Sequence, residues 1–183
     1  RGKGNALRAG FEAATGDIIV MIDADGSTDP SEIPAFVDCL LHGADFAKGS
    51  RFLEHARSGT ADMPLLRKLG NWGFVAAVRL FFGGRYTDLC YGYNAFWASA
   101  LPHLKLDADG FEIETLMNIR ALRAGLNVEE VPSFEYERVH GVGRLQTFPD
   151  GWRVLKTILK EFARSLSARP TAAPQLKSLR TRT

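Results

Sequence analysis

A short run of large apolar residues at positions 18–22 ends in two aspartates, and this run constrains the fold more than any other stretch. It is rich in β-branched side chains, is too short for an ordinary helix, and is bounded by turn-forming residues. This pattern predicts a strand that is buried on both faces, as in parallel sheets. Asp23 and Asp25 then lie at the carboxyl end of the strand, where open α/β sheets bind their ligands.

The spacing of these two aspartates indicates a divalent metal site. Two hard carboxylate donors held close together, followed by residues that let the chain turn, suit Mg²⁺ or Mn²⁺ that carries a substrate diphosphate. The simpler alternative is that Asp23 and Asp25 only cap the turn and the helix that begins near Pro30.

Three classes of protein carry similar residues after a strand. A calcium-binding EF-hand is excluded, because the loop positions that need Gly and Glu are Thr28 and Pro34 here. A phosphatase of the haloacid dehalogenase type would use Asp23 as its nucleophile. Such an enzyme also needs a later acidic pair for Mg²⁺, and we find no Asp-Asp pair and no Gly-Asp-x-x-x-Asp motif after residue 30. The third class uses an Asp-x-Asp motif to bind a nucleotide sugar.

The composition is that of one domain with a hydrophobic core, since 45% of the 183 residues are hydrophobic. A net charge of +2 gives no sign of a nucleic-acid partner. The two cysteines lack the Cys-x-x-Cys spacing, which favours buried thiols in a reducing compartment. We find no signal peptide and no uninterrupted apolar span of about 18 residues, and therefore expect a cytoplasmic protein, at most peripheral at the cytoplasmic face of a membrane.

Hydrophobic periodicity predicts the remaining elements. We expect helices before residue 16, at about 30–42, at 65–82, over about 107–123 and at 151–166. Strands are expected at about 44–52, 94–98 and 126–135, and a loop at 53–63. A helix that leads into a parallel strand normally follows an earlier strand, so we expect the sequence to be a fragment.

Further charged residues fall where predicted strands end or in loops at the same edge of the sheet. Arg51 ends the second predicted strand and can pair with phosphate through its planar guanidinium. Asp88 is the carboxylate of an aromatic stretch that suits either a core or a sugar-stacking platform. Glu112 and Glu114 do not share a helical face, and we expect Glu114 to face the site. The other candidates are basic groups at a helix start or in a glycine-rich loop suited to an anion: Arg67, Arg138, His140 and Arg144.

The order of these motifs resembles the family 2 glycosyltransferases, in particular those that act on dolichol phosphate or polyprenyl phosphate. The similarity covers about residues 1–160 and includes Gly-Lys-Gly, Asp-Ala-Asp-Gly, Gly-Ser-Arg, Thr-Asp-Leu, Phe-Glu-Ile-Glu and Arg-Val-His-Gly. Each motif is weak alone, but six in this order are specific. The resemblance implies an α/β protein of the GT-A type, a Rossmann-like and mostly parallel sheet with helices on both faces. That sheet would be incomplete at the N-terminus, without its first nucleotide-binding strand and loop.

The resemblance also implies the roles of the site residues. Asp25 would hold Mg²⁺ or Mn²⁺, and Asp23 would contact the metal or the ribose of a nucleoside diphosphate sugar. Arg51 and Arg67 would bind the diphosphate or an acceptor phosphate. The basic groups expected to close over them are those of the glycine-rich loop, Arg138, His140 and Arg144.

The implied reaction is inverting transfer of a sugar to a polyprenyl or dolichyl phosphate. The alternative acceptor is a saccharide hydroxyl in cell-envelope polysaccharide synthesis. A hydroxyl needs a base to accept its proton, and Asp88 is our first choice for that role. Two residues depart from the family pattern: Ser27 stands where an amide side chain is common, and Arg144 replaces a commoner Lys.

We expect a catalytic domain at residues 1–150, an amphipathic basic helix at 151–167 and a disordered tail at 168–183. The helix has Trp152, Leu159 and Leu166 on one side and Lys156 and Lys160 on another. It can pack on the domain with a solvated basic face, or it can lie on an anionic membrane surface.

Overall fold

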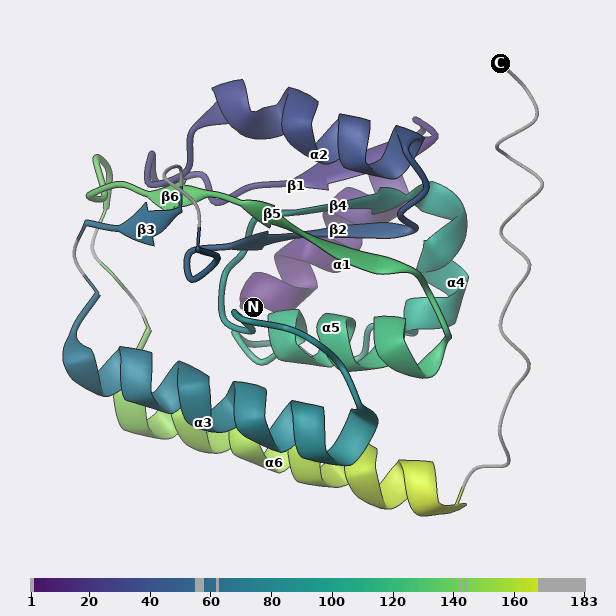
Figure 1. Cartoon of the computed structure of the whole chain (residues 1–183), viewed down its shortest axis with the longest axis vertical. Coiled ribbons are helices and arrows are strands. Elements are labelled where there is room, and N and C mark those ends of the chain that lie inside the picture. The colour runs from purple at the N-terminus through teal and green to yellow at the C-terminus, as the bar shows by residue number, and fades with distance from the viewer. Residues whose placement is uncertain (1, 55–57, 62, 142, 144, 168–183) are drawn as a thin grey trace.

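A computed structural model describes residues 2–54, 58–61, 63–141, 143 and 145–167 (Figure 1). Its main sheet has four strands in the spatial order β1 (Ile18–Met21), β4 (Asn94–Trp97), β2 (Phe46–Ser50) and β5 (Val128–Pro132). β4 pairs antiparallel with β1 and with β2, whereas β2 and β5 pair in parallel. Three strands therefore run in one direction and β4 runs against them, so the sheet is mostly parallel, as predicted.

The strand predicted after Gly16 exists, but its neighbour differs from the expectation of a parallel partner. β1 pairs antiparallel with β4, and no other described strand pairs with it. Ile19 and Met21 are buried on one face, while Ile18 and Val20 are half-buried on the other. The apolar pattern predicts which faces of a strand are buried, but it does not identify the strand that pairs with it.

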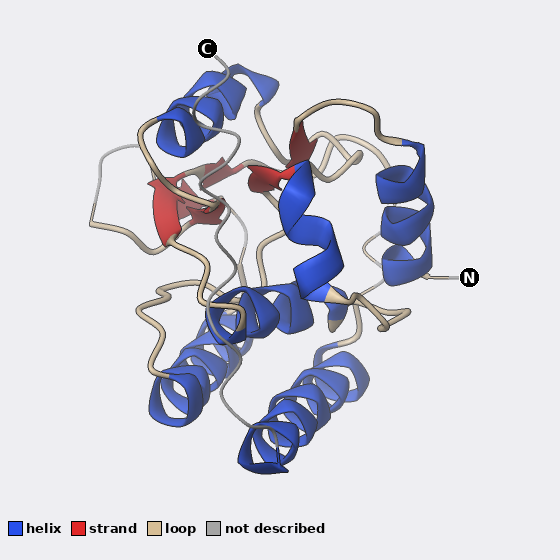
Figure 2. Cartoon of the chain, turned by 90° about the vertical axis from the view of Figure 1, so that its right-hand side faces the viewer, coloured by secondary structure: helices blue, strands red, loops and turns tan. Residues whose placement is uncertain are grey.

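Helices cover both faces of the sheet (Figures 1 and 2). One face packs against α2 (Ile33–Leu41), which follows a short 3-10 turn, Pro30–Glu32. The other face packs against α1 (Lys3–Ala13), α4 (Leu101–Leu104) and α5 (Ile113–Arg123), with the 3-10 turn Ala98–Ala100 before α4. Phe96 joins this core by stacking on Phe46 at 5.4 Å and by meeting the edge of the Phe11 ring.

Two long helices form an outer layer beyond α5. These are α3 (Leu65–Phe82) and α6 (Thr147–Ser167), and their apolar residues form a third core cluster with Ile119 of α5. The predicted helix at 65–82 is confirmed and ends at Gly83, whose φ of 73° is in the left-handed region that favours glycine. α6 begins four residues before the predicted start, because the side chain of Asp150 accepts a hydrogen bond from the Gln146 backbone N–H.

A second, two-stranded sheet lies beside the carboxyl ends of β2 and β5. It pairs β3 (Gly59–Thr60) in parallel with β6 (Phe134–Glu135). The expected loop at 53–63 therefore contains a strand, although residues 55–57 and 62 lie outside the described residues. This pairing brings Glu135 close to Arg51 at the end of β2.

The expected boundary at residue 150 falls inside α6, whose Val154 and Ile158 belong to the same cluster as α3 and α5. The expected tail at 168–183 lies outside the described residues. Within the part of the chain that the structure describes, every helix is either too short or too polar to cross a membrane.

Candidate active site

The loop that follows β1 presents Asp23 and Asp25 at the carboxyl end of the strand. Ser27 holds the Asp25 carboxylate, donating from its backbone N–H at 3.0 Å and from its hydroxyl at 2.6 Å to the same oxygen. Gly26 between them has a φ of 82°, a conformation that favours glycine. Partial burial raises the pKa of Asp25, but the hydrogen bonds from Ser27 and the charge of Arg138 outweigh it, so the pKa lies below its ordinary value.

Arg138 reaches this loop from the segment that follows β6. Its Nη1 lies 2.8 Å from Oδ2 of Asp25. The backbone N–H groups of Val139 and His140 each donate to the backbone carbonyl of Asp25 at 3.0 Å. The sequence predicted that Arg138 and His140 lie near the aspartates, and the structure brings them together. The His140 side chain is exposed, and Arg144 lies outside the described residues.

Lys3 and Glu114 complete the surroundings of Asp23. The Lys3 ammonium lies 2.6 Å from Oδ1 of Asp23 and also pairs with Glu114, from the first turn of α5. Burial lowers the pKa of Lys3, but the two carboxylates raise it more, and it lies above its ordinary value. Glu114 therefore lies beside the loop that carries Asp23 and Asp25, here called the acidic loop, as expected, whereas Glu112 accepts a hydrogen bond from the Gly110 backbone.

Gly92 allows this three-residue contact to form. A Cβ added at Gly92 would lie 2.7 Å from Oδ2 of Asp23, and 2.9 Å from both Oε1 of Glu114 and the Lys3 ammonium. Neither Lys3 nor Gly92 was among the residues that the sequence predicted for the site. The Gly-Lys-Gly motif was a signal for Lys3, but nothing local in the sequence indicates which side chains surround Gly92.

Arg51 and Asp88 form a buried pair at the end of β2. Nε and Nη2 of Arg51 donate to the two carboxylate oxygens of Asp88 at 2.7 and 3.0 Å, and Nη1 lies 2.7 Å from Glu135. Arg51 is 6% exposed and Asp88 is 0% exposed. The expected roles, phosphate binding by Arg51 and proton acceptance by Asp88, require groups that a substrate can reach. In this conformation the Arg51 guanidinium and the Asp88 carboxylate bind each other instead of a substrate.

Polar contacts fix the segment that carries Asp88. Glu130 accepts hydrogen bonds from the backbone and hydroxyl of Thr87, both at 2.8 Å. Lys48 is fully buried and donates to the carbonyls of Gly49 and Tyr91. Burial lowers the pKa of Lys48 and raises that of Glu130. These groups lie beneath the site, and we did not single them out from the sequence.

Arg67 lies at the start of α3 and is exposed. Its Nη2 donates to the carbonyl of Leu145 at 3.2 Å, and its Nε lies 3.4 Å from the hydroxyl of Thr147. Arg67 therefore connects the start of α3 with the segment that leads from Arg138 into α6. Its expected contact with phosphate stays a prediction.

The sequence model of "Glycosyl transferase family 2" matches residues 1–98, just over half of the chain. The chain belongs to this family. Its fold is the GT-A fold, as predicted. Family 2 membership also favours the transferase over the phosphatase alternative that would use Asp23 as a nucleophile.

Relatives of this family 2 chain come from archaea and bacteria. It is 31% identical over 160 residues to the low-salt glycan biosynthesis hexosyltransferase of Haloferax volcanii, covering 87% of this chain and 38% of the relative. It is 31% identical over 150 residues to undecaprenyl-phosphate mannosyltransferase of Micrococcus luteus, covering 79% of this chain and 60% of the relative. The chain therefore spans only part of the length of the relatives that it matches.

The chain also aligns with a solved structure of the same fold. Glucosyl-3-phosphoglycerate synthase from Mycobacterium tuberculosis, in complex with Mn²⁺, uridine-diphosphate-glucose and glycerol 3-phosphate, has a TM-score of 0.66 and 25% identity. The alignment covers 89% of this chain and 56% of that one. The GT-A fold therefore extends well past residue 98.

The acidic loop of this family 2 domain has the donor set for a divalent cation that is shared with a substrate. Among the described residues, no three His, Cys, Asp or Glu side chains form a ready-made metal cluster. Mg²⁺ and Mn²⁺ do not require one when a diphosphate is present, because one or two carboxylates hold the ion and phosphate and water oxygens complete its coordination. Asp23 and Asp25, which pair with Lys3 and Arg138 in this conformation, would provide those carboxylates, and Ser27 orients Asp25 instead of standing free as a third ligand.

Proposed function

We propose that the complete protein transfers a hexose from a nucleoside diphosphate sugar to a polyprenyl or dolichyl phosphate, with inversion at the anomeric carbon. The observation that carries this proposal is the contact between the acidic loop and Arg138, which places two carboxylates and a guanidinium at one edge of the sheet. This combination suits a diphosphate, because the carboxylates bind a cation and the guanidinium binds phosphate oxygens directly.

The leaving group decides what these residues must do. When bound at Asp23 and Asp25, Mg²⁺ or Mn²⁺ would neutralise charge on the departing nucleoside diphosphate. Ser27 keeps Asp25 in place, and Arg138, together with His140 and Arg144 of the same loop, would stabilise the developing negative charge. The complex of the mycobacterial synthase with Mn²⁺ and a uridine diphosphate sugar supports the choice of donor and metal.

The burial of Asp88 favours a phosphate acceptor over a hydroxyl. An acceptor hydroxyl needs a carboxylate that can reach it and take its proton, whereas a lipid phosphate is already ionised. Asp88 is enclosed with Arg51, and Asp23 and Glu114 share the Lys3 ammonium. The undecaprenyl-phosphate acceptor in the name of the Micrococcus relative supports the same choice. Arg67, exposed beside the loop, is the residue that we expect to contact the acceptor phosphate.

The mechanism that follows is a single displacement. An oxygen of the acceptor phosphate attacks the anomeric carbon from the side opposite the leaving diphosphate, and the bond to the diphosphate breaks as the new bond forms. No residue of this chain forms a covalent bond to the sugar. The residues hold the two anions in line and screen the charge between them.

The test uses the full-length protein and a panel of nucleotide sugars, with and without polyprenyl phosphate. We expect turnover that requires the lipid phosphate and a divalent ion. Asp25→Ala should reduce turnover at least about a hundredfold, as losses of groups that stabilise developing charge do. Asp38→Ala, at an exposed position of α2, is the matched control. Undiminished turnover in Asp25→Ala, or transfer to saccharides alone, would contradict the proposal.

A further inference from the structure

The side of α3 opposite its buried residues carries no charged residue, because Arg67, Lys68 and Arg79 project from other sides of the helix. Its buried residues, Asn71, Val75 and Val78, lie on one side of the helix. At 3.6 residues per turn, the opposite side presents small and large apolar groups only. Its large members are half or more exposed: Leu65, Leu66, Leu69, Trp72 and Leu80, with Leu80 at 80%. A solvent-facing helix normally carries charged and polar groups on that side, so this face is suited to a partner.

α6 has an exposed apolar stripe and, next to it, a basic one. The apolar stripe consists of Phe148, Trp152, Leu159 and Leu166, which are between 47% and 77% exposed. The basic stripe consists of Arg153, Lys156, Lys160 and Arg164. Both acidic residues of α6 point inward: Asp150 is 5% exposed and Glu161 is 1% exposed.

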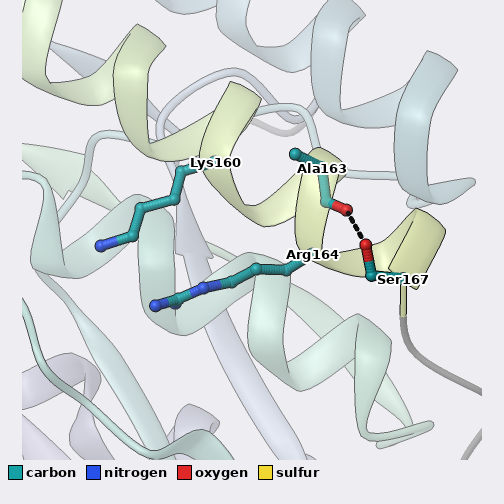
Figure 3. Close-up of a pocket in the computed structure, with 4 residues that line it drawn as sticks. All are labelled: Lys160, Ala163, Arg164 and Ser167. Atoms are coloured by element: carbon teal, nitrogen blue, oxygen red, sulfur yellow. Dashed lines mark hydrogen bonds between the residues drawn. The ribbon is translucent and has the colours of Figure 1, made fainter.

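The four basic groups differ in their partners. Arg153 pairs with Asp150 at 3.1 Å, and Arg164 pairs with Glu161 at 2.7 Å. Within the described part of the chain, Lys156 and Lys160 have no carboxylate partner, and Lys156 lies over the Trp152 ring at 5.4 Å. Figure 3 shows Lys160 and Arg164 extending side by side from α6, at the edge of a shallow hollow of about 410 Å³. The surface of α6 therefore has a net positive charge beside its apolar stripe.

The two helices lie side by side and run in the same direction (Figure 1). Near their starts Arg67 contacts Thr147, and near their ends Phe81 stacks on Phe162 at 4.3 Å. On each helix the exposed apolar residues lie opposite the buried residues that pack with α5, so the two apolar stripes face the same side and form one surface. We call this surface the α3/α6 surface: the apolar residues of both stripes, bordered by Lys156 and Lys160.

We propose that the α3/α6 surface docks on a lipid bilayer that contains anionic headgroups. Charge complementarity favours a bilayer as the partner. The surface is apolar, neither helix exposes a carboxylate on it, and two lysines without carboxylate partners lie at its border. A bilayer with anionic headgroups is apolar in its interior and negatively charged at its surface. Docking itself does not depend on the proposed function. Only its purpose rests on that function, because an enzyme docked on the membrane meets a lipid-phosphate acceptor there.

The location of the surface agrees with that purpose. α6 begins where the segment that contacts Asp25 through Arg138 ends, and Arg67 joins the starts of both helices. The amino-terminal end of the α3/α6 surface therefore lies next to the candidate active site. A bilayer on this surface would bring headgroup phosphates to the side of the molecule where Arg67 and Arg138 lie.

The experiment is co-sedimentation of the chain with vesicles, and it needs no enzymatic activity. We expect binding to vesicles of phosphatidylcholine with phosphatidylglycerol, and weaker binding to phosphatidylcholine alone. The double variant Leu80→Glu with Phe148→Glu should weaken binding at least about tenfold, because it removes two apolar anchors and adds like charge. Both positions are more than three quarters exposed, so the fold should tolerate the change.

A second variant isolates the electrostatic part. Lys156→Gln with Lys160→Gln should weaken binding to the anionic vesicles by about fivefold per charge, and should leave binding to phosphatidylcholine unchanged. Leu41→Glu on α2 and Lys105→Gln are the matched controls, both exposed and outside the surface. Circular dichroism checks that each variant is folded.

Three outcomes would overturn the proposal. The first is wild-type chain that stays in the supernatant with anionic vesicles. The second is binding that neither double variant weakens. The third is a wild-type dimer in size-exclusion chromatography that the Leu80→Glu and Phe148→Glu variant converts to monomer without any effect of lipid, which would assign the surface to a second copy of the chain. Failure of sugar transfer with vesicle binding intact would affect only the proposed function.

Discussion

At the scale of single residues, two cations around the candidate site each bridge two carboxylates. Lys3 bridges Asp23 and Glu114, and Arg51 bridges Asp88 and Glu135. Removing one member of a buried ion pair leaves the other charge without its partner, which usually costs more than the pair contributed. Single substitutions in these contacts should therefore have large effects, and effects that are not additive within one contact.

Gly92→Ala tests the contact around Asp23. The new methyl group would lie against Asp23, Glu114 and Lys3, so at least one of them must move. We expect the free energy of unfolding to fall by about 1–3 kcal/mol, as in other overpacked sites. The affinity of the full-length protein for Mn²⁺, measured by calorimetry, should fall as Asp23 is displaced. Gly10→Ala in α1, where no atom outside the neighbouring helix backbone lies within 4 Å of the added Cβ, should instead be neutral or stabilising. Equal Mn²⁺ affinity in Gly92→Ala and in wild type would contradict the prediction.

Asp88→Asn tests the buried pair with Arg51. Burial raises the pKa of Asp88, but the charge and hydrogen bonds of Arg51 lower it more, so the pKa lies below its ordinary value. The charged form therefore stabilises the fold above the unfolded-state pKa of about 3.9, and this contribution is lost as the pH falls toward the folded-state pKa. We expect the variant to lose about 3–5 kcal/mol at neutral pH. The difference from wild type should shrink below about pH 4.

Urea unfolding at a series of pH values measures this difference, with Asp38→Asn at an exposed position as control. A variant as stable as wild type at neutral pH would show that the pair with Arg51 contributes nothing.

At the scale of elements, the sequence predicted what depends on local periodicity. The helix at 65–82 and the strands at 18–22, 44–52 and 94–98 follow from the spacing of apolar residues, and each is present within a few residues. The antiparallel pairing of β1 with β4 was not predicted, because the partner of a strand depends on residues far away in the chain. β3 and β6 have two residues each, which is too few for a periodic signal.

The candidate site was predictable to the same extent. Asp23 and Asp25 carry a local signal, since they end an apolar strand, and Arg138 lies in a glycine-rich loop. The burial of Arg51 with Asp88 could not be predicted, because a charged residue at the end of a strand is compatible both with a phosphate site and with an internal ion pair. The motif order placed both residues near the site, but only the packing of β6 and the segment at 86–91 determines which contacts they make.

At the scale of the whole molecule, the layers connect the site with the outer surface. The sheet carries the acidic loop, α5 carries Glu114 beneath it, and α3 and α6 pack on α5 as the outermost layer. The backbone of Tyr136, Val139 and His140 contacts the acidic loop, and α6 follows shortly afterwards in the sequence. If the α3/α6 surface docks on a bilayer, membrane binding should therefore affect the rate of sugar transfer even when the residues that bind the donor are unchanged.

This connection predicts a difference between two kinds of acceptor. In the full-length protein, Leu80→Glu with Phe148→Glu should lower kcat/KM at least about tenfold for polyprenyl phosphate embedded in anionic vesicles, because the enzyme must first bind the surface. For a short-chain, water-soluble prenyl phosphate the same variant should differ from wild type by less than about twofold, because that acceptor reaches Arg67 from solution. Leu41→Glu should match wild type with both acceptors. An equal loss of kcat/KM with the soluble and the embedded acceptor would mean that the substitutions disturb the site itself. No loss of kcat/KM with either acceptor would mean that transfer does not depend on docking through α3 and α6.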